Sequence, residues 1–575
     1  MQRIIGVSVV LFMTLSIRAA TGQDILQGRG VDSRVDYSEL TRYGPWDDRN
    51  YALTQEDLAL LAPGEAELPV AIPAFHRVYL RRTFPELRRA GALQYPRSVV
   101  AKYLVRHGGY LVDGKLYRRV RREGGRFVLT LSDGLDQTAF LERKALDGEV
   151  RVSSPEGNAE SAIAANPVDP DFVIAGSNGL DGQDMHYSSD GGETWNEATL
   201  PLGNSCCDPS VGWSSDGIYA YAVTLGFGAG EPNFFYRSAD KGQTWGDLAN
   251  APGAGGDPRR EFGSVTDKCY LHVDLHPTSP HKDNIYVTWH ENNVMQLGRS
   301  TDSGNNWTTQ SFASVADQLG IGSDITTDKD GNVHYFWPAD SRRIWLRKST
   351  DGGVSYAPVV EVATTEASYD FPLPSVETNR AWIYVSVDTD RSDGPYGGSV
   401  YAAWTDTTAP DVGNPSNNHA RIQVGTSRDG GASWTVATPH ETADANLVDR
   451  WNQWLSVGPD GTVYVIFYDT RGDPARTAVD LYYSTSTDGA QTFSTPARLT
   501  SQPSPNVADG FEFGDYNGLD IVMSDLIAVY TDNRSEGGGG GDSVDIYAVG
   551  VAVEAADSLF EDGFEAGDTS AWPGS

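Results

Sequence analysis

The 575-residue chain has only 3 cysteines and 10 scattered histidines, and it lacks a G-x-S-x-G motif. So few cysteines exclude a small scaffold held together by disulfides, and the missing motif removes the usual sign of Ser/His/Asp hydrolysis. Beyond the N-terminus no stretch is long and apolar enough to span a bilayer. Basic residues are also scarce, with 44 Lys and Arg against 78 Asp and Glu. We therefore expect no nucleic-acid partner, because phosphate binding needs a basic face.

Glycine (62), tyrosine (27) and tryptophan (14) are plentiful, which suits many short strands joined by tight turns. The length predicts two or more structural units. The net charge of −34 is uneven: residues 24–150 carry 20 Lys and Arg against 18 Asp and Glu, whereas residues 151–575 carry about −38. This acidity indicates either solubility outside the cell or cation binding.

The N-terminus has the features of a secretory signal peptide. Arg3 provides the charged start, residues 4–17 form an apolar run, and Ala20 and Gly22 are small residues placed for cleavage after Gly22. A retained membrane anchor is the alternative. We predict a secreted protein, extracellular or periplasmic, without a membrane span once the signal is removed.

One eight-residue pattern recurs six times at intervals typical of a propeller blade. The copies are SSDGGETW (188–195), SADKGQTW (238–245), STDSGNNW (300–307), STDGGVSY (349–356), SRDGGASW (427–434) and STDGAQTF (486–493). In such a hairpin the aspartate accepts hydrogen bonds from turn amides, and glycine takes a conformation closed to other residues. The repeated aspartates are therefore predicted to be structural: Asp190, Asp240, Asp302, Asp351, Asp429 and Asp488.

These repeats resemble the Asp-box (BNR repeat) of the sialidase superfamily, S-x-D-x-G-x-T-W. The first two copies match it fully, and the other four depart at one to three positions. The departures are Asn306, Ser355 and Ser433 for threonine, Tyr356 and Phe493 for tryptophan, and Ala490 for glycine. The resemblance covers roughly residues 155–553 and implies a β-propeller.

A strand pattern accompanies the turns. Pairs of predicted strands, such as 452–459 with 462–469, can be counted independently of the turns, and seven occur. The last unit ends at 546–553 without a turn of its own, so residues 150–154 are predicted to supply its missing strand and close the ring. We predict an all-β propeller of four-stranded antiparallel blades, with seven blades favoured over the six of catalytic sialidases.

The predicted domain boundaries follow from these patterns. They are a signal peptide (1–22), a small N-terminal accessory or pro-segment region (23–148), the Asp-box propeller (149–553) and an acidic C-terminal tail (554–575). The accessory region contains an apparent hairpin at 110–117 with a turn at Asp113-Gly114.

The rim opposite the Asp-box turns is the predicted ligand face, because loops at the channel mouth gather there. The candidates on this face are Asp208, Asp267, Asp324, Asp340, Arg342, Asp406, Asp449, Arg450, Asp515 and Asp532. Carboxylates accept hydrogen bonds from hydroxyls or chelate hard cations, and guanidinium groups bind carboxylates in a bidentate manner. A polyol, a sugar or Ca²⁺ would suit this face. Alternatively, Asp-x-Arg pairs such as Asp469 and Arg471 simply link neighbouring blades.

If the resemblance extends to activity, it implies a sialidase site with three arginines for the substrate carboxylate, a tyrosine nucleophile with a glutamate, and an acid/base aspartate. The R-I-P motif expected before the first Asp-box is missing from residues 158–170. The remaining candidates are Tyr516, Asp469, Arg471 and Arg534, with Arg342 as a further clamp residue. The fold is therefore better supported than the activity.

The three cysteines are predicted to meet at the channel mouth. Cys206 and Cys207 open one inner strand and Cys269 lies near the start of the next. We predict a disulfide between Cys269 and one of the pair, which leaves one thiol over. A metal site of Cys269 with His272 is not expected, because residues three apart on a strand point to opposite faces.

The sequence thus predicts a secreted sialidase-like propeller that binds or hydrolyses glycans, as an exo-glycosidase if it is catalytic. The alternative is a non-catalytic propeller that acts as a binding or surface-interaction scaffold. Its expected partner is a glycan or other extracellular ligand. No cofactor is expected to be required, and Ca²⁺ is an option.

Overall fold

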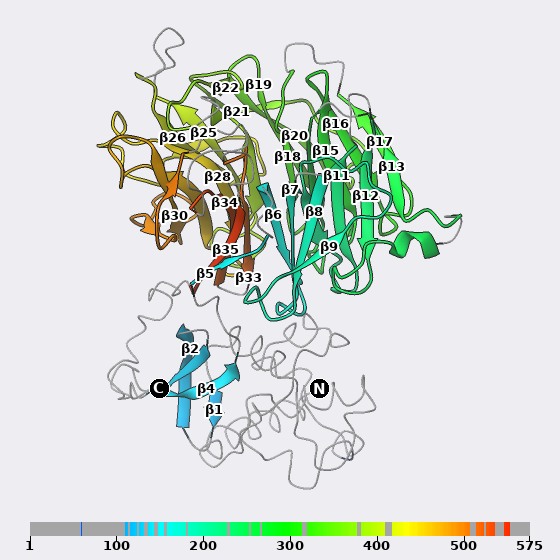
Figure 1. Ribbon diagram of the computed structural model, residues 1–575, viewed down its shortest axis with the longest axis horizontal. Helices are drawn as coiled ribbons and strands as arrows, with labels where there is room; N and C mark the ends of the chain where they lie inside the picture. Colours follow the sequence, from blue (N-terminus) through cyan, green and yellow to red (C-terminus); the bar gives the residue numbers. More distant parts are fainter. Residues whose placement is uncertain are drawn as a thin grey trace, which may run out of the picture. The chain divides into compact units, whose positions relative to one another are not determined.

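The computed structural model describes most of residues 148–552, together with Ala59 and four strands between residues 110 and 142 (Figure 1). The gaps within the larger range are 154–157, 180–181, 227–230, 252–254, 265–266, 313–318, 377–380, 409–416, 507–512, 523–524 and 535–544. The predicted signal peptide and acidic tail lie outside the described residues. The chain divides into two compact units, 1–145 and 146–575. The described part contains no helix whose length and hydropathy would let it cross a lipid bilayer.

The first unit contains one antiparallel sheet of four strands in chain order. They are β1 (Tyr110–Val112), β2 (Lys115–Glu123), β3 (Arg126–Leu131) and β4 (Asp136–Glu142). Tyr110 pairs with Tyr117 and Val112 with Lys115. This register confirms the hairpin predicted at 110–117.

The second unit is a ring of seven four-stranded antiparallel blades, which confirms the predicted fold and blade number. The first strand of each blade is the inner one, because these strands contact one another in succession around the ring and β33 contacts β6. The inner strands are β6 (Ala159–Ala165), β10 (Ser210–Trp213), β14 (Asp267–Val273), β18 (Asp324–Thr327), β24 (Val385–Thr389), β28 (Arg450–Val457) and β33 (Gly518–Val522).

The second strands of the blades are β7 (Val173–Gly179), β11 (Ala220–Leu225), β15 (Ile285–Glu291), β19 (Val333–Ala339), β25 (Val400–Thr407), β29 (Val463–Asp469) and β34 (Asp525–Asp532). The third strands are β8 (Gly182–Ser188), β12 (Asn233–Ser238), β16 (Val294–Ser300), β20 (Arg343–Ser349), β26 (Ala420–Ser427), β30 (Ala478–Ser486) and β35 (Asp545–Ala552). The fourth strands are β9 (Asn196–Thr199), β13 (Arg259–Phe262), β17 (Thr308–Ser311), β21 (Val360–Thr364), β27 (Thr435–Ala437), β31 (Ala497–Arg498) and β5 (Glu149–Arg151). Short additions are the hairpin β22 (Asp370–Phe371) with β23 (Ala381–Trp382), the strand β32 (Ser504–Pro505) beside β30, and the 3-10 helix η5 (Asp247–Asn250).

The ring closes through β5, the strand that precedes the first blade in the sequence. β5 pairs with β35, with Ala548 opposite Val150 and Tyr547 opposite Arg151. The prediction that residues near 150–154 complete the last blade is confirmed. Closure in this way gives the last blade its fourth strand from a segment that precedes the first blade in the sequence.

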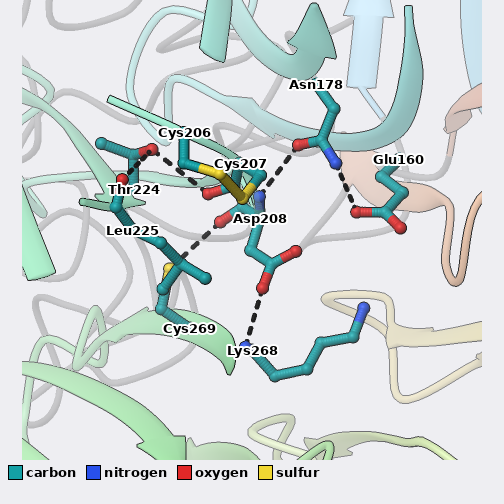
Figure 2. Close-up of a disulfide and its surroundings, with 9 residues drawn as sticks. All are labelled: Glu160, Asn178, Cys206, Cys207, Asp208, Thr224, Leu225, Lys268 and Cys269. Carbon is teal, nitrogen blue, oxygen red and sulfur yellow. Dashed lines mark hydrogen bonds between the residues drawn. A yellow bond between two sulfur atoms is a disulfide. The ribbon is translucent and has the colours of Figure 1, made fainter. Parts of the chain in front are cut away.

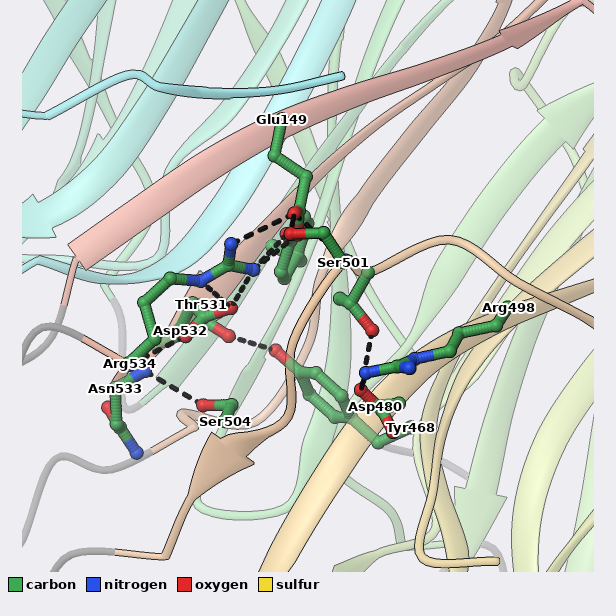
Figure 3. A network of polar contacts seen from close by, with 12 residues as sticks. Glu149, Tyr468, Asp480, Arg498, Ser501, Ser504, Thr531, Asp532, Asn533 and Arg534 are labelled. Atoms are coloured by element: carbon green, nitrogen blue, oxygen red, sulfur yellow. Dashed lines mark hydrogen bonds and ion pairs between the residues drawn. The ribbon is translucent and has the colours of Figure 1, made fainter. Parts of the chain in front are cut away.

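A polar network reinforces this closure (Figure 3). Glu149 of β5 accepts hydrogen bonds from the Tyr530 hydroxyl at 2.5 Å and from Nη1 of Arg534 at 2.9 Å. Burial alone would raise the pKa of Glu149, but hydrogen bonds from Arg534 and Ser501 outweigh it and lower the pKa to about 2. The closing strand is therefore held by a charge-assisted contact as well as by its backbone.

The six repeated turns join the third and fourth strands of blades one to six. In the first copy, Asp190 accepts from the backbone N–H of Thr194 at 2.9 Å and from its hydroxyl at 2.6 Å, and Gly192 N–H donates to Ser188 Oγ at 2.8 Å. All six turns repeat this pattern, with Asn306, Ser355 or Ser433 in place of threonine in three copies. Ala490 occupies the position of Gly192 and takes the same left-handed backbone, with φ of 59°. The turn aspartates thus stabilise the hairpins through these hydrogen bonds.

The hydrophobic core fills the spaces between blades. Residues of β7 and β8 pack against residues of β10, β11 and β12, and similar clusters follow around the ring. Six tryptophans are among the largest fully buried side chains: Trp213, Trp245, Trp289, Trp337, Trp404 and Trp451. Each such burial contributes about 1.5–3 kcal/mol or more.

Polar side chains link the inner strands across the channel wall. Asp324 Oδ2 accepts from Val387 N–H at 2.9 Å, which joins blades four and five, and Asp520 Oδ2 accepts from Ala165 N–H at 2.7 Å, which joins blades seven and one. Burial raises the pKa of Asp324 to about 7 and that of Asp520 to about 6. The wall therefore contains carboxyl groups that hold protons near neutral pH.

Candidate functional site

Several inner strands begin with a residue in the left-handed backbone conformation. Glu160, Lys268 and Asn452 have φ of 53°, 57° and 48°, and each coincides with a register shift in its inner strand. Asp208, just before β10, has φ of 57°. A bulge inserts one extra residue and redirects its side chain. The bulges thereby change the direction of charged side chains at the starts of the inner strands, which lie at the mouth of the channel.

We call the resulting group the mouth cluster. Its members are Glu160, Asp208, Asp267, Lys268, Tyr384, Asp515 and Tyr516, contributed by blades one, two, three, five and seven. The four carboxyl groups interact electrostatically with the one lysine. Glu160, Asp267 and Asp515 are half-buried, whereas Asp208 and Lys268 are buried.

Hydrogen bonds centred on Asp208 fasten three blades together at the mouth (Figure 2). The Asp208 N–H donates to Asn178 Oδ1 at 2.9 Å, and Asp208 Oδ2 accepts from Lys268 N–H at 2.7 Å. Asn178 in turn donates to Glu160 Oε2 at 2.6 Å. The positions of Glu160, Asp208 and Lys268 are therefore set jointly.

Lys268 is held between aromatic rings. Its side chain is 1% exposed, and its ammonium lies 3.4 Å from Asp515 Oδ2. The ammonium is 3.7 Å from the ring centre of Tyr516 and 4.5 Å from that of Tyr384, within cation–π range. Among the described residues this ammonium and the buried hydroxyls of Tyr384 and Tyr516 have no hydrogen-bond partner. The cluster thus offers buried polar atoms whose hydrogen-bonding capacity is unused within the described chain.

The carboxyl groups of the cluster hold protons more tightly than usual. Burial raises the pKa of Asp208 to about 7, and the neighbouring Asp267 charge and its hydrogen bond add to the shift. Burial also raises the pKa of Glu160 well above its ordinary value, although the Lys268 charge opposes this. Burial would lower the pKa of Lys268, but the charges of Asp515 and Glu160 outweigh it and raise that pKa. The lysine is therefore charged, and Asp208 changes protonation near neutral pH.

Tyr516 was a candidate nucleophile. Burial raises its pKa well above the ordinary value, with the charges of Asp208 and Glu160 acting in the same direction. Its ring packs edge-on against Tyr270 at 5.5 Å and carries the Lys268 ammonium on its face. A phenol with a raised pKa stays protonated, which is the opposite of what an activated nucleophile needs.

The candidate arginines are engaged by carboxylates. Arg471 pairs with Asp469 at 2.8 Å and with Glu441 at 3.0 Å. Arg534 pairs with Asp532 at 2.6 Å and with Glu149, as Figure 3 shows. Each arginine of these Asp-x-Arg pairs binds the aspartate two residues before it. These contacts lie within a blade or on the connection leading into it.

Two further candidates belong to the same sixth-blade network. Arg450, fully buried, pairs with Asp469 and Asp444, both at 2.7 Å. Asp449 pairs with Arg476 at 2.6 Å and with His419 Nδ1 at 2.9 Å. The charges of these groups are paired with one another, and the pairs stabilise the connection between blades five and six.

The other predicted ligand-face residues are spread over separate places. Asp324 lies in the channel wall, as described above. Asp406 is buried and accepts from the N–H groups of Glu366 and Thr407 at 3.0 and 2.9 Å. Asp340 and Arg342 are exposed on the turn between β19 and β20. The structure thus brings Asp208, Asp267 and Asp515 together and leaves the rest outside the mouth cluster.

Sequence reasoning missed Glu160, Lys268 and Tyr384. Glu160 and Lys268 are the second residues of β6 and β14, close to the place that Asp208 has before β10, so their position along the blade repeat was a usable signal. The bulges that redirect them depend on pairing with the second strand and leave no pattern in the sequence. Tyr384 lies just before β24 and had no motif.

The predicted disulfide of Cys269 is wrong. The structure joins the adjacent residues Cys206 and Cys207, with Cα atoms 3.7 Å apart, and leaves Cys269 as a buried thiol (Figure 2). The Cys269 thiol donates to the Asp208 carbonyl at 3.1 Å. Neighbouring side chains on an extended strand point apart, but Cys206 and Cys207 precede β10 on a connecting segment, where their sulfurs meet. His272 binds Thr327 instead, at 2.8 Å.

Metal ligands do not gather at the mouth in the manner of a dedicated site. Within the described ranges, no group of three or more His, Cys, Asp or Glu side chains is arranged to hold a metal ion. Calcium dependence stays a prediction.

Comparisons with known proteins locate the chain only broadly. A family model described as a domain of unknown function (DUF8300) matches residues 36–121. No curated protein matches the sequence. Similar solved structures include the phage phi92 endosialidase, at 11% identity and a TM-score of 0.41, covering 72% of this chain and 70% of that one. An α-L-arabinofuranosidase from Fusarium graminearum with an iminosugar inhibitor has 10% identity and a TM-score of 0.39, covering 70% and 97% of the two chains. The NanB sialidase from Streptococcus pneumoniae has 10% identity and a TM-score of 0.35, covering 58% and 68%.

Proposed function

We propose that the protein is a secreted Asp-box propeller of the sialidase-superfamily type that binds glycans at the mouth cluster, and that it prefers neutral or amino-bearing glycans to acidic ones. The observation that carries this proposal is the composition of the cluster. It has four carboxyl groups and one lysine already engaged by Asp515, and the buried hydroxyls of Tyr384 and Tyr516 lie beside them.

The cluster has the chemistry that sugar hydroxyls need. Carboxylates accept hydrogen bonds from vicinal hydroxyls, and phenol groups both donate and accept. Trp382 stacks on Tyr384 with ring centres 5.2 Å apart and planes 9° from parallel. Such an aromatic surface suits the apolar face of a sugar ring. Three half-buried acids on the rim and aromatic rings beside them form a glycan site of ordinary composition.

Charge argues against a sialoside. A sialic acid carboxylate needs cations, yet Arg471 and Arg534 are engaged by carboxylates and the mouth cluster is acidic. Freeing one arginine would leave a buried carboxylate unpaired, which costs several kcal/mol. Binding without sialidase activity therefore agrees better with the contacts.

Hydrolysis of a different glycoside is the second candidate, favoured by one observation. Asp208 and Asp267 share a hydrogen bond, and burial raises the pKa of Asp208 to about 7. A carboxyl group that holds its proton near neutral pH beside a second acid is the arrangement used for general acid catalysis. Under this candidate Asp208 donates the proton to the leaving oxygen.

The test of binding uses three oligosaccharide probes in calorimetry: de-N-acetylated chitotetraose, cellotetraose and the trisaccharide sialyl-lactose. We expect binding of the first two and none of the third. Binding of cellotetraose, which has no titrating group of its own, should strengthen as the pH rises through 7, because Asp208 then loses its proton and becomes a full hydrogen-bond acceptor. Repeating the titration with EDTA and with Ca²⁺ tests the calcium option. Sialyl-lactose as the only ligand would contradict the proposal.

Single substitutions test whether the probes bind at the mouth cluster or elsewhere on the ring. Asp515→Asn keeps the shape of the half-buried side chain but removes its charge, and we expect about tenfold weaker binding of the cationic probe. The matched control is Asp351→Asn, in an exposed turn of the opposite rim, which should bind as the parent does. A panel of aryl glycosides tests turnover: cleavage that disappears in Asp208→Asn would establish the second candidate. N-terminal sequencing of exported protein tests cleavage after Gly22.

A further inference from the structure

We propose that the Cys206–Cys207 disulfide is a positioning element of the mouth cluster, which holds Asp208 in place, so that reduction of this bridge by a dithiol loosens the mouth and weakens ligand binding. The effect on binding rests on the proposed function. The effect on the mouth itself does not, because it concerns contacts within the chain.

The bridged pair is anchored to the end of the second strand of its blade. Cys206 N–H donates to the Leu225 carbonyl at 2.8 Å, and Leu225 N–H donates to the Cys207 carbonyl at 3.1 Å. The Thr224 hydroxyl reaches the same Cys207 carbonyl at 3.2 Å (Figure 2). The disulfide closes a small ring that contains the Cys206–Cys207 peptide, so it restricts the segment that leads into Asp208.

Asp208 needs such a restriction because its conformation is unfavourable on its own. It has φ of 57°, a region that residues with a Cβ atom rarely adopt. Pro209 follows it, and a proline further limits the backbone of the residue before it. Such a conformation persists only where the surroundings enforce it. The bridge, together with the hydrogen bonds that join Cys206 and Cys207 to Leu225, enforces it here.

The position of Asp208 then fixes the rest of the mouth cluster. Its backbone N–H and carboxylate hold Asn178 of blade one and Lys268 of blade three, and its carbonyl accepts the Cys269 thiol. Lys268 carries its ammonium between Tyr516 and Tyr384. A change in the backbone at Asp208 would therefore displace side chains on blades one, three, five and seven.

The reduction step is chemically complete with a dithiol as reductant. Both cysteines are half-buried, so a small reductant can reach a sulfur. A dithiol thiolate attacks one sulfur and forms a mixed disulfide, and its second thiolate then releases the cysteine. Two electrons pass to the protein, the reductant becomes a cyclic disulfide, and each cysteine sulfur takes up one proton. Burial raises the pKa of the Cys269 thiol well above its ordinary value, so Cys269 stays protonated and does not attack the bridge.

Amide hydrogen exchange tests the positioning without any ligand. The full-length protein is compared before and after dithiothreitol treatment, and alkylation followed by intact mass measurement counts the thiols released. We expect about tenfold faster exchange at the Asp208 and Lys268 amides, with unchanged exchange in β28 on the far blade. Unchanged exchange at both amides with the bridge fully reduced would overturn the proposal. Equally faster exchange in β28 would also overturn it, since the bridge would then stabilise the whole ring.

A binding profile against pH gives a second, independent readout. Cellotetraose, which has no titrating group of its own, is titrated into oxidised, reduced and reoxidised protein between pH 5 and pH 9. Reduction should weaken binding about tenfold and remove the titration near pH 7 that belongs to Asp208, and reoxidation should restore both. Reductant should have no effect on the Cys206→Ser/Cys207→Ser variant. If the probe does not bind oxidised protein, the proposed function fails, while the exchange experiment still decides the role of the bridge.

Discussion

Asp324 makes the stability of the propeller decrease as the pH rises, and one substitution can measure this. The carboxyl group lies in the channel wall with the residue 7% exposed. It accepts from Ile325 N–H at 2.8 Å and from Val387 N–H at 2.9 Å. Burial raises its pKa from 3.8 to about 7. The folded chain thus binds this proton more tightly than the unfolded chain does.

The sign and size of the effect follow from linkage. Because the pKa is raised on folding, the contribution is complete below pH 4 and is lost as the pH rises through 7. Each pH unit in this window corresponds to about 1.4 kcal/mol, so Asp324 alone removes about 4 kcal/mol from the free energy of unfolding between pH 4 and pH 7. Asp324→Asn abolishes the titration, but its amide can accept only one of the two N–H groups properly, at a cost of about 1–3 kcal/mol.

The removed titration and the imperfectly accepted N–H group together predict that the two curves of unfolding free energy against pH, for the parent and for Asp324→Asn, cross. At pH 5 the variant should be less stable than the parent, and at pH 8 it should be equally or more stable. Urea denaturation followed by tryptophan fluorescence at pH 5, 6, 7 and 8 measures the difference. Asp351→Asn is the matched control, because turn hydrogen bonds, mainly from Ser355, lower the pKa of Asp351 and place its titration below this window. A difference between parent and Asp324→Asn that stays constant from pH 5 to pH 8 would refute the reasoning.

Two more predictions concern ring closure and the mouth. Glu149→Gln should lower the free energy of unfolding by about 1–3 kcal/mol at pH 7, because Arg534 loses its charged partner on the closing strand. This difference in unfolding free energy should shrink only below pH 4, because Glu149 of the parent, with its pKa lowered to about 2, loses its charge there as well. A difference that vanished at pH 6 would contradict the prediction. Lys268→Met removes the cation of the mouth cluster, so de-N-acetylated chitotetraose should bind more tightly at pH 6, where its amines are charged. Calorimetry that showed weaker binding would count against an acidic site.

The propeller could be predicted because its signals are local and repeated. Each repeated turn is specified by side chains four residues apart, such as Asp190 and Thr194, and the paired strands beside these turns were counted independently. The closing strand β5 could be predicted because the last unit lacked a fourth strand. Such features follow from short-range hydrogen bonding and from the need to complete the last four-stranded blade.

The mouth cluster was harder to predict from the sequence because it depends on contacts between blades. Asp208 and Asp515 were recognised as candidates, but Glu160 and Lys268 join them only through bulges whose register the sequence does not reveal. The bridge between Cys206 and Cys207 depends on the path of a connection, and the expected partner, Cys269, instead donates to a backbone carbonyl. Spacing along the chain indicates which side chains reach the rim, whereas their pairing is decided by packing across it.

A co-crystal structure with the tightest-binding glycan probe tests the central claim most directly. We expect sugar hydroxyls or amines within hydrogen-bond distance of Glu160, Asp267 or Asp515, at the mouth of a seven-bladed ring. Density for the glycan at the rim that carries the six repeated turns, or at Arg471 and Arg534 with their carboxylate partners displaced, would contradict the assignment of the mouth cluster as the binding site.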